Sequence, residues 1–170
     1  MPLNTSIAIF AIDGGGTTGC ATALLDMRRI TVAAAMKRAR AKSNIETWTV
    51  KGDHVEQAWT IARQVTDFYF MMHVEKALIN FNSFYVVAES FQLRQMSAEL
   101  TTVAVNAGIE TLLKPAFNGR WGDVYFPQTA SEAKGFCTND MLDRWNLLRG
   151  ITTHERDALR HIAARLDKML

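Results

Sequence analysis

Apolar residues along the chain fall into two alternating patterns: short continuous runs and longer helical repeats. The runs have the length typical of strands, and the continuous ones suit strands that are buried on both faces. The expected strands are Ile7–Ile12, Cys20–Leu25, Thr47–Val50 within the less regular segment 30–50, Ser83–Ala88, and Val124–Phe126 closed by Pro127. The Gly-rich segment 14–16 joins the first two runs and suits a hairpin turn.

The longer repeats predict helices. They cover Val55–Leu78 after an N-cap at Asp53, Met96–Leu113 stopping before Pro115, Ala130–Leu148 with a break near Gly135, and a last helix after Gly150. In the first of these helices the residues at helical spacing are Val55, Trp59, Ala62, Val65 and Phe68, which we expect to form one face. The last helix starts with Thr152 as N-cap and Glu155 three residues on, which is the pattern of a capping box.

The predicted order is three strands, a helix, a strand, a helix, a strand and helices. A strand meander followed by alternating units favours an α/β fold with a five-stranded mixed sheet flanked by helices. The 170 residues fit a single domain, 1–170, with a core of its own.

Composition indicates which class of protein this is but does not decide its function. The chain is 48% hydrophobic and 21% charged, as in ordinary globular proteins, and its net charge of +2 is too small to prove a nucleic-acid partner. No signal-peptide pattern and no run long enough to cross a bilayer is seen, so no membrane partner is expected. Cys20 and Cys137 lie far apart and in no metal-binding spacing. We therefore expect a cytoplasmic location, in a bacterial or phage-infected cell.

Two predicted strands end in a carboxylate, Asp13 after "IFAI" and Glu89 after "YVVA". Either acid alone is common at the start of a loop. If the two strands are parallel neighbours, however, the acids lie about 5 Å apart. Two carboxylates at that distance repel each other unless a divalent cation lies between them.

The last helix offers further candidates. His154, Asp157 and His161 fall on one stripe of that helix, beside its apolar side. The alternative is a solvated flank with no role in chemistry. Lys134, seven residues after Pro127, is either a residue that orients a phosphate or a water, or an ordinary surface lysine.

Basic residues are concentrated between Arg28 and Lys42. They are Arg28, Arg29, Lys37, Arg38, Arg40 and Lys42. One interpretation is a solvated strand edge or loop, and the other is a surface that contacts phosphates.

Four segments in chain order together resemble one family. They are "IDGGGTTG" at 12–19, "VVAES" at 86–90, "PQTASEAKGFCTND" at 127–140 and "THERDALRHIAARL" at 153–166. They look like the first aspartate turn, the second-strand acid, the proline–lysine segment and the terminal H-x-x-D-A-x-x-H helix of RuvC-type Holliday-junction resolvases, particularly phage members. The family's usual proline after the first aspartate is Gly14 here.

This resemblance implies a ribonuclease H-like fold and a homodimer that binds branched DNA, resolving four-way junctions by paired nicking with two Mg²⁺ or Mn²⁺ ions. The implied metal ligands are Asp13, Glu89, His154 and Asp157, with Lys134 assisting at the scissile phosphate. Arg144 is the nearest candidate for a second basic residue. The expected DNA contacts are Gly15, Gly16, Thr17, Arg38, Arg40, Arg94, Lys134 and Arg144.

Other functions fit parts of the same pattern. The turn "DGGGTTG" also looks like the first phosphate loop of an actin-like or sugar-kinase ATPase. Such ATPases need a second lobe with its own Gly-rich turn, which does not follow Glu89 here, and they do not need the stripe on the last helix. A ribosomal-RNA-precursor nuclease of the same fold and a junction-binding protein that does not cut also remain open.

A dimer requires an apolar contact surface. Two predicted helices carry more apolar residues than one buried stripe needs. They are Met96–Leu113 and Val55–Leu78, the latter with Phe68, Tyr69, Phe70, Met71 and Met72 in a row.

Overall fold

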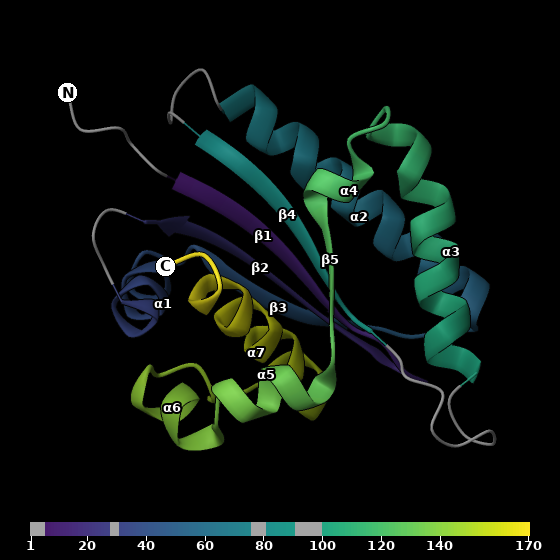
Figure 1. Ribbon diagram of the computed structural model, residues 1–170. Helices are drawn as coiled ribbons and strands as arrows, with labels where there is room; N and C mark the ends of the chain where they lie inside the picture. The colour runs from purple at the N-terminus through teal and green to yellow at the C-terminus, as the bar shows by residue number, and fades with distance from the viewer. Residues whose placement is uncertain (1–5, 28–30, 76–80, 91–99) are drawn as a thin grey trace.

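The fold is a single five-stranded sheet with helices on both faces (Figure 1). The computed structural model describes residues 6–27, 31–75, 81–90 and 100–170. Its strands are β1 (Ser6–Asp13), β2 (Thr18–Asp26), β3 (Ile45–Val50), β4 (Phe81–Glu89) and β5 (Tyr125–Gln128). Its helices are α1 (Val32–Ala41), α2 (His54–Glu75), α3 (Leu100–Ala116), α4 (Trp121–Val124), α5 (Ala130–Phe136), α6 (Asn139–Arg144) and α7 (Thr153–Asp167).

The strand order across the sheet is β3-β2-β1-β4-β5. The β1–β2 and β2–β3 pairs are antiparallel, whereas β1–β4 and β4–β5 are parallel. This is the predicted mixed sheet, and it places β1 and β4, the two strands that end in an acid, side by side at its centre.

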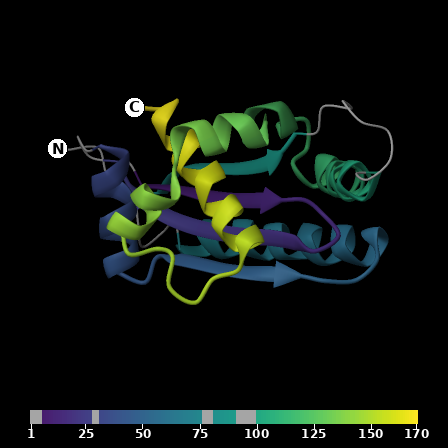
Figure 2. The same ribbon diagram turned by 90° about the horizontal axis from the view of Figure 1, so that it is seen from below.

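Each face of the sheet has its own core because alternate residues of β1 point to opposite sides. Ala8, Phe10 and Ile12 pack under α2 and α3. Ile7, Ile9 and Ala11 pack under α1 and α7, and α6 adds Leu142 to this second core. Figure 2, seen from below, separates the two helical layers, with α2 behind the sheet and α7 in front of it.

The expectation that the basic stretch is a strand edge or loop is wrong for residues 32–41, which form α1. Thr31 caps this helix, since its Oγ1 accepts from the Ala34 N–H. Val32, Ala35, Met36 and Ala39 are buried against the sheet. The charged residues occupy the outer face. The segment is therefore an amphipathic helix, which its many basic residues made hard to recognise from sequence.

Several further boundaries differ from expectation. Strand β5 is not closed by Pro127 but continues to Gln128, and α6 ends at Arg144 rather than at Leu148. Helix α3 does not stop before Pro115 but includes it and ends at Ala116. A proline costs one helical hydrogen bond, and burial of Phe117 just beyond holds this last turn against the sheet. The predicted break near Gly135 comes two residues later, at Cys137, between α5 and α6.

The predicted apolar face of α2 is only partly correct. Ala62 and Val65 are buried, but Val55 and Trp59 point outward. Gln57 occupies the buried side of the first turn instead, where its amide bonds polar groups of the sheet edge. In the part of the chain that is described, no helix combines the length and apolarity needed to span a membrane.

Candidate active site

The candidate site lies where β1 and β4 end. The strands are parallel and in register, with Ile12 opposite Ala88, so Asp13 and Glu89 emerge at the same edge of the sheet. Asp13 is buried and Glu89 is half-buried. Their side chains are close enough for each to affect the pKa of the other. The expected adjacency of the two acids is confirmed.

Helix α7 brings a histidine to this pair. Its first turn is fixed by the predicted capping box, in which Thr152 Oγ1 accepts from the Glu155 N–H and the Thr152 N–H donates to Glu155 Oε2. His154, two residues into the helix, places Nδ1 3.1 Å from Asp13 Oδ2. The cap therefore sets where the histidine meets the strand-end acid.

Close contact between α7 and the sheet depends on Gly19, which pairs with Asp13 across β1 and β2. A Cβ built on Gly19 would lie 2.1 Å from the His154 carbonyl oxygen, and real side chains do not approach so closely. Glycine at this position lets the backbone of α7 lie directly on β2. This contact brings His154 within reach of Asp13.

Asp157, one turn further along α7, is buried and surrounded by cations. Lys134 Nζ on α5 lies 3.1 Å from Asp157 Oδ2. Arg160 Nη1 donates to Asp157 Oδ1, and Arg160 Nη2 donates to Asn139 Oδ1 at 2.6 Å. Arg156 Nε is a more distant neighbour at 3.8 Å. The solvated-flank alternative is wrong for Asp157, and Lys134 is not an isolated surface lysine.

His161 belongs to the same stripe but faces inward. It is buried, and its Nδ1 lies 3.1 Å from the side-chain amide of Gln128 at the end of β5. Burial lowers the pKa of His161 to about 4, so the ring is neutral at physiological pH. His161 thus joins α7 to β5 behind the site.

The glycine loop after Asp13 is held from two sides. On α3, Thr102 Oγ1 donates to the Gly14 carbonyl, and Asn106 Nδ2 donates to the Glu89 carbonyl at 2.6 Å. On α2, the buried Gln57 accepts from Thr18 Oγ1 and donates to the Gly16 carbonyl at 3.2 Å. These contacts fix the loop that connects the two antiparallel strands at the site.

Lack of space explains the glycine at position 14 of this loop but not the one at position 16. A Cβ on Gly14 would meet Thr102 Cγ2 at 2.9 Å, whereas one on Gly16 would have no heavy atom within 4 Å. Gly16 is exposed at the apex of the loop. A ligand therefore finds bare backbone beside Asp13 and His154.

The electrostatics of the acid pair favour a bound cation. Burial, followed by the charge of Asp157, raises the pKa of Asp13 to about 7. Burial, followed by the charge of Asp13, raises the pKa of Glu89 to about 7. Two such carboxyls retain a proton near neutral pH because neither opposing charge nor water compensates them fully. A divalent cation would replace that proton.

Among the described residues, no three Asp, Glu, His or Cys side chains are already arranged to hold a metal ion. The donor chemistry nevertheless fits a hard cation, since carboxylate oxygens are the ligands that Mg²⁺ prefers. His154 and Asp157 approach from the helix side, and Asp157 carries its own cationic partners.

Several predicted DNA contacts lie elsewhere. Arg38 pairs with Asp26, whose strand position is opposite Ser6 and thus at the far end of β1 from Asp13, roughly 20 Å away by strand geometry. Arg40 bonds the Asn146 carbonyl, and Arg144 is exposed and bonds the Asp140 carbonyl on its own helix. Arg94 lies outside the described residues. Gly15 and Thr17 remain at the site, beside Gly16.

Sequence reasoning missed Arg160, Gln57, Thr102 and Asn106. Arg160 is the buried basic residue that contacts Asp157, whereas Arg144, the candidate for a second basic residue, bonds a carbonyl of its own helix. Its position three residues after Asp157, on the same helical face, was the available signal. The amide and hydroxyl residues gave no signal, because most of their partners belong to distant segments of the chain.

The sequence matches no family model and no curated protein. Among solved structures, the fold is similar to that of Thermus thermophilus RuvC, with a TM-score of 0.59 and 13% identity over 95% of this chain and 96% of that one. T. thermophilus RuvC in complex with a Holliday junction substrate gives a TM-score of 0.57 and 14% identity over the same shares. At this identity the likeness shows a RuvC-like, ribonuclease H-like fold.

Proposed function

We propose that this chain is a metal-dependent endonuclease that cuts branched DNA, with the four-way junction as its preferred substrate. The convergence of Asp13, Glu89, His154 and Asp157 at one edge of the sheet carries the proposal. The RuvC-like fold over nearly the whole chain supports it, because a protein of that fold has been solved with a Holliday junction substrate.

The residues suit phosphodiester hydrolysis. Two Mg²⁺ or Mn²⁺ ions held by Asp13, Glu89, Asp157 and His154 would supply an activated water and neutralise charge on the leaving oxygen. The imidazole of His154 favours Mn²⁺ over Mg²⁺, which prefers oxygen donors. Lys134, more than half exposed beside Asp157, is placed to bind a phosphate oxygen, while Arg160 is buried and positions Asp157.

The exposed apex of the glycine loop would admit the DNA backbone. Gly15 and Gly16 carry no side chain between solvent and the acid pair, so a phosphate can approach Asp13 closely. Paired nicking of opposite strands requires two such sites related by a two-fold axis, and we therefore propose that the active form is a homodimer.

The test uses a mobile four-way junction labelled on each strand in turn. With Mn²⁺ we expect nicks near the branch point on a pair of strands of like polarity, and with EDTA we expect binding without cutting. A linear duplex of the same sequence is the control. Cutting of the duplex and the junction at equal rates, or the absence of junction cutting with any divalent ion, would refute the proposal.

A further inference from the structure

One edge of the sheet is open along β3. This strand is the last in the order β3-β2-β1-β4-β5, so among the described strands only β2 pairs with it. Figure 2 shows β3 along the lower margin of the sheet, with no described helix or strand beyond it. Its sequence, IETWTV, contains neither lysine nor proline, the residues that most often block such an edge. The outer side of β3 is therefore available for pairing with another strand.

The register of the β2–β3 ladder shows which backbone groups of β3 point outward. Ala23 lies opposite Ile45, and the Leu24 N–H donates to the Asn44 carbonyl at 2.9 Å. Residues 46, 48 and 50 therefore direct their N–H and C=O groups toward β2, and residues 45, 47 and 49 direct theirs outward. Among the described residues, none hydrogen-bonds the outward backbone groups of Thr47 or Thr49. These unpaired donors and acceptors are the groups that an added strand would bond.

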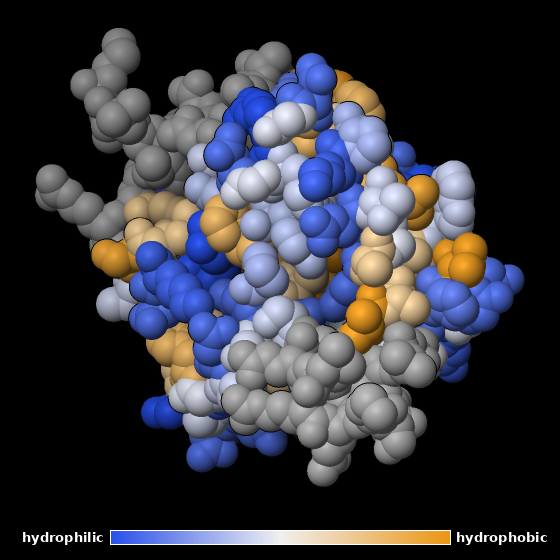
Figure 3. Space-filling view, turned by 45° about the vertical axis from the view of Figure 1, so that its right-hand side comes forward, coloured by the Kyte–Doolittle hydropathy of each residue, from blue (hydrophilic) through white to orange (hydrophobic). Residues whose placement is uncertain are grey.

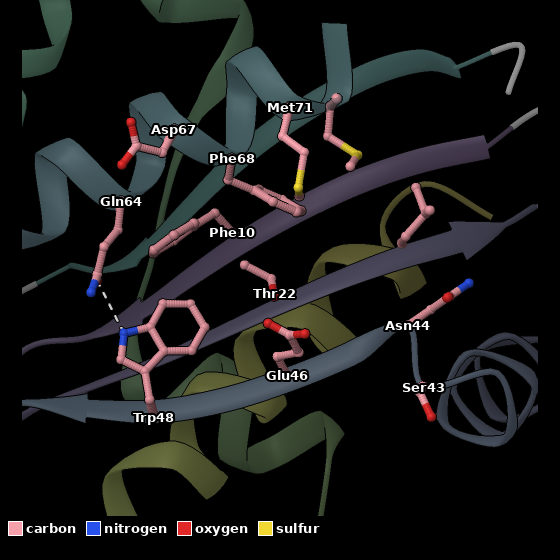
Figure 4. Close-up of a pocket in the computed structure, with 12 residues that line it drawn as sticks. Phe10, Thr22, Ser43, Asn44, Glu46, Trp48, Gln64, Asp67, Phe68 and Met71 are labelled. Carbon is pink, nitrogen blue, oxygen red and sulfur yellow. Dashed lines mark hydrogen bonds between the residues drawn. The ribbon is translucent and has the colours of Figure 1, made fainter. Parts of the chain in front are cut away.

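A groove on the α2 side of β3 offers side-chain contacts along the same edge. It has a volume of about 480 Å³ and lies between α2 and the strands β2 and β3 (Figure 4). Gln64 fixes one wall, because its Oε1 accepts from Trp48 Nε1 at 3.0 Å. The apolar residues that line the groove are Phe10, Leu24, Trp48, Phe68, Met71 and Met72. This lining suits an apolar side chain, whereas the face turned forward in Figure 3 is mostly hydrophilic, with its apolar residues in small separate groups.

The rim of this groove is acidic. Glu46, on the same face of β3 as Trp48, is exposed and has no ion-pair partner among the described residues. Asp67, on the α2 side of the groove, is 71% exposed and pairs at 3.9 Å with Arg63, which is itself 82% exposed. Such a solvated pair leaves the charge of Asp67 available to a further cation. A basic residue opposite Glu46 in an added strand would form an opposite-charge cross-strand pair.

The other face of β3, on the α7 side, carries the opposite charge. Arg40, Thr47 and Arg149 line a pocket of about 200 Å³ there. Arg40 Nε donates to the Asn146 carbonyl at 3.3 Å, which fixes the side chain beside β3. Neither arginine forms an ion pair with a carboxylate of the described residues. A side chain opposite Thr47 in an added strand would therefore be favoured if it were acidic.

We infer that an extended peptide of a partner protein binds the open edge of β3 as an added antiparallel strand. The direction is antiparallel because this pairing is the more stable per residue. Opposite Trp48, Thr47 and Glu46 the peptide presents an apolar, an acidic and a basic residue, in that order. The apolar and basic side chains lie over the groove on the α2 side, and the acidic one faces the two arginines on the α7 side.

The charge pattern distinguishes a peptide from a nucleic acid. A DNA or RNA strand along this edge would bring its phosphates near Glu46 and Asp67, which would repel them. A nucleic-acid backbone also lacks the alternating N–H and C=O groups that pair with Thr47 and Thr49. The inference thus concerns a protein partner, and it does not rest on the proposed function.

The probe is a fluorescein-labelled peptide of the sequence Thr-Thr-Leu-Glu-Arg-Thr, titrated with the full chain in the absence of DNA and divalent metal. Fluorescence anisotropy should show saturable binding, at least tenfold tighter than that of a second peptide in which leucine and glutamate are exchanged. This control has the same composition and charge, but it directs its acid toward the acidic groove and its leucine toward the arginines. Equal affinity of the two peptides, or binding of neither, would overturn the inference.

Methylation of single peptide amides tests the added strand itself. In antiparallel pairing the N–H of the peptide's glutamate points to Thr47, whereas the N–H of its leucine points to solvent. Methylation of the glutamate amide should weaken binding at least tenfold, and methylation of the leucine amide should change it by less than threefold. Equal losses would show that the groove binds side chains alone, without strand addition. The reverse order of losses would overturn the antiparallel direction.

Charge reversal tests the assignment to β3. Glu46→Lys should weaken binding of the probe at least tenfold, and a peptide with glutamate in place of its arginine should bind this variant within about threefold of the original pair. Asp123→Lys reverses an exposed acid next to β5, at the opposite edge of the sheet, and as the matched control should have no effect. Unchanged binding to Glu46→Lys, or a loss that the exchanged peptide does not restore, would contradict the register.

Discussion

At the residue scale, the carboxyl pair formed by Asp13 and Glu89 lies at the centre of the proposed site. Their raised pKa values mean that the pair holds a proton near neutral pH. Such a pair costs free energy in the absence of a cation, because burial disfavours its charge. Binding of Mg²⁺ or Mn²⁺ would recover that free energy, so metal binding should be coupled to folding stability.

Asp13→Asn tests this coupling. Saturating Mn²⁺, at about 100 times its dissociation constant, should raise the melting temperature of the wild type by roughly 5–10 °C and leave that of Asp13→Asn nearly unchanged. Junction cutting should fall by on the order of 1,000-fold or more. Junction binding should persist, because one negative charge is removed next to the phosphate. Binding is followed by fluorescence anisotropy, and retention of cutting would exclude Asp13 as a ligand.

His161 makes a separate prediction about pH. Its pKa is about 4 in the folded chain and ordinarily 6.5, so the unfolded chain binds more protons between these values. The neutral ring thus contributes stability above pH 6.5 that is lost as the pH falls toward 4. The loss is about 3 kcal/mol at most.

Asp13 and Glu89 titrate in the opposite sense, since their raised pKa values favour the folded state as the pH falls. The comparison of wild type with His161→Asn removes their effect. The stability advantage of the wild type in urea unfolding should shrink from pH 7 to pH 4. A constant difference across this range would show that His161 does not enter the fold as a neutral ring.

At the element scale, the contact of α7 with β2 positions the site. Thr152 and Glu155 fix the first turn of the helix, and Gly19 lets that turn lie on the sheet. This arrangement requires no long loop to bring His154 and Asp157 toward Asp13. A change that pushes α7 away should therefore damage both stability and the site.

Gly19→Ala supplies this change, with Gly16→Ala as its matched control. The added methyl group at Gly19 collides with the His154 backbone and should cost about 1–3 kcal/mol or more. At Gly16 the methyl group meets open space, so stability should stay constant or rise by up to about 1 kcal/mol. Thermal unfolding distinguishes them, and equal melting temperatures for the two variants would contradict the close contact.

At the scale of the whole molecule, basic residues are spread over a wide surface. The described cations near the site include Lys134, while Lys37, Arg38, Arg40 and Lys42 are exposed on or just beyond α1.

Junction affinity should consequently fall steeply with salt, by at least tenfold between 50 and 200 mM, because each neutralised phosphate releases counterions. Arg38→Glu with Arg40→Glu should reduce the slope of log K against log salt by about one per lost contact. Arg120→Glu serves as the control. A slope unchanged by the α1 variant would place the arms of the junction away from this helix.

The sequence alone determined the sheet and its acids. Continuous apolar runs ending in Asp13 and Glu89 specify buried strands, and a β1–β4 pair that is parallel must bring their ends together. The capping box of α7 was equally local, since Thr152 and Glu155 bond each other's backbone. Local patterns predict such features because the interacting groups are near neighbours in the chain.

Only the tertiary structure decided how the remaining polar groups are used. Arg160 contacts Asp157 rather than solvent, and Gln57 turns inward to hold the glycine loop, which leaves Trp59 exposed. Periodicity treats every position of a helix alike and contains no information on which distant carbonyl or carboxylate lies opposite. The same reason explains why α1 was not predicted. Its sequence contains many charged residues, and only the folded sheet shows that four of its other residues are buried.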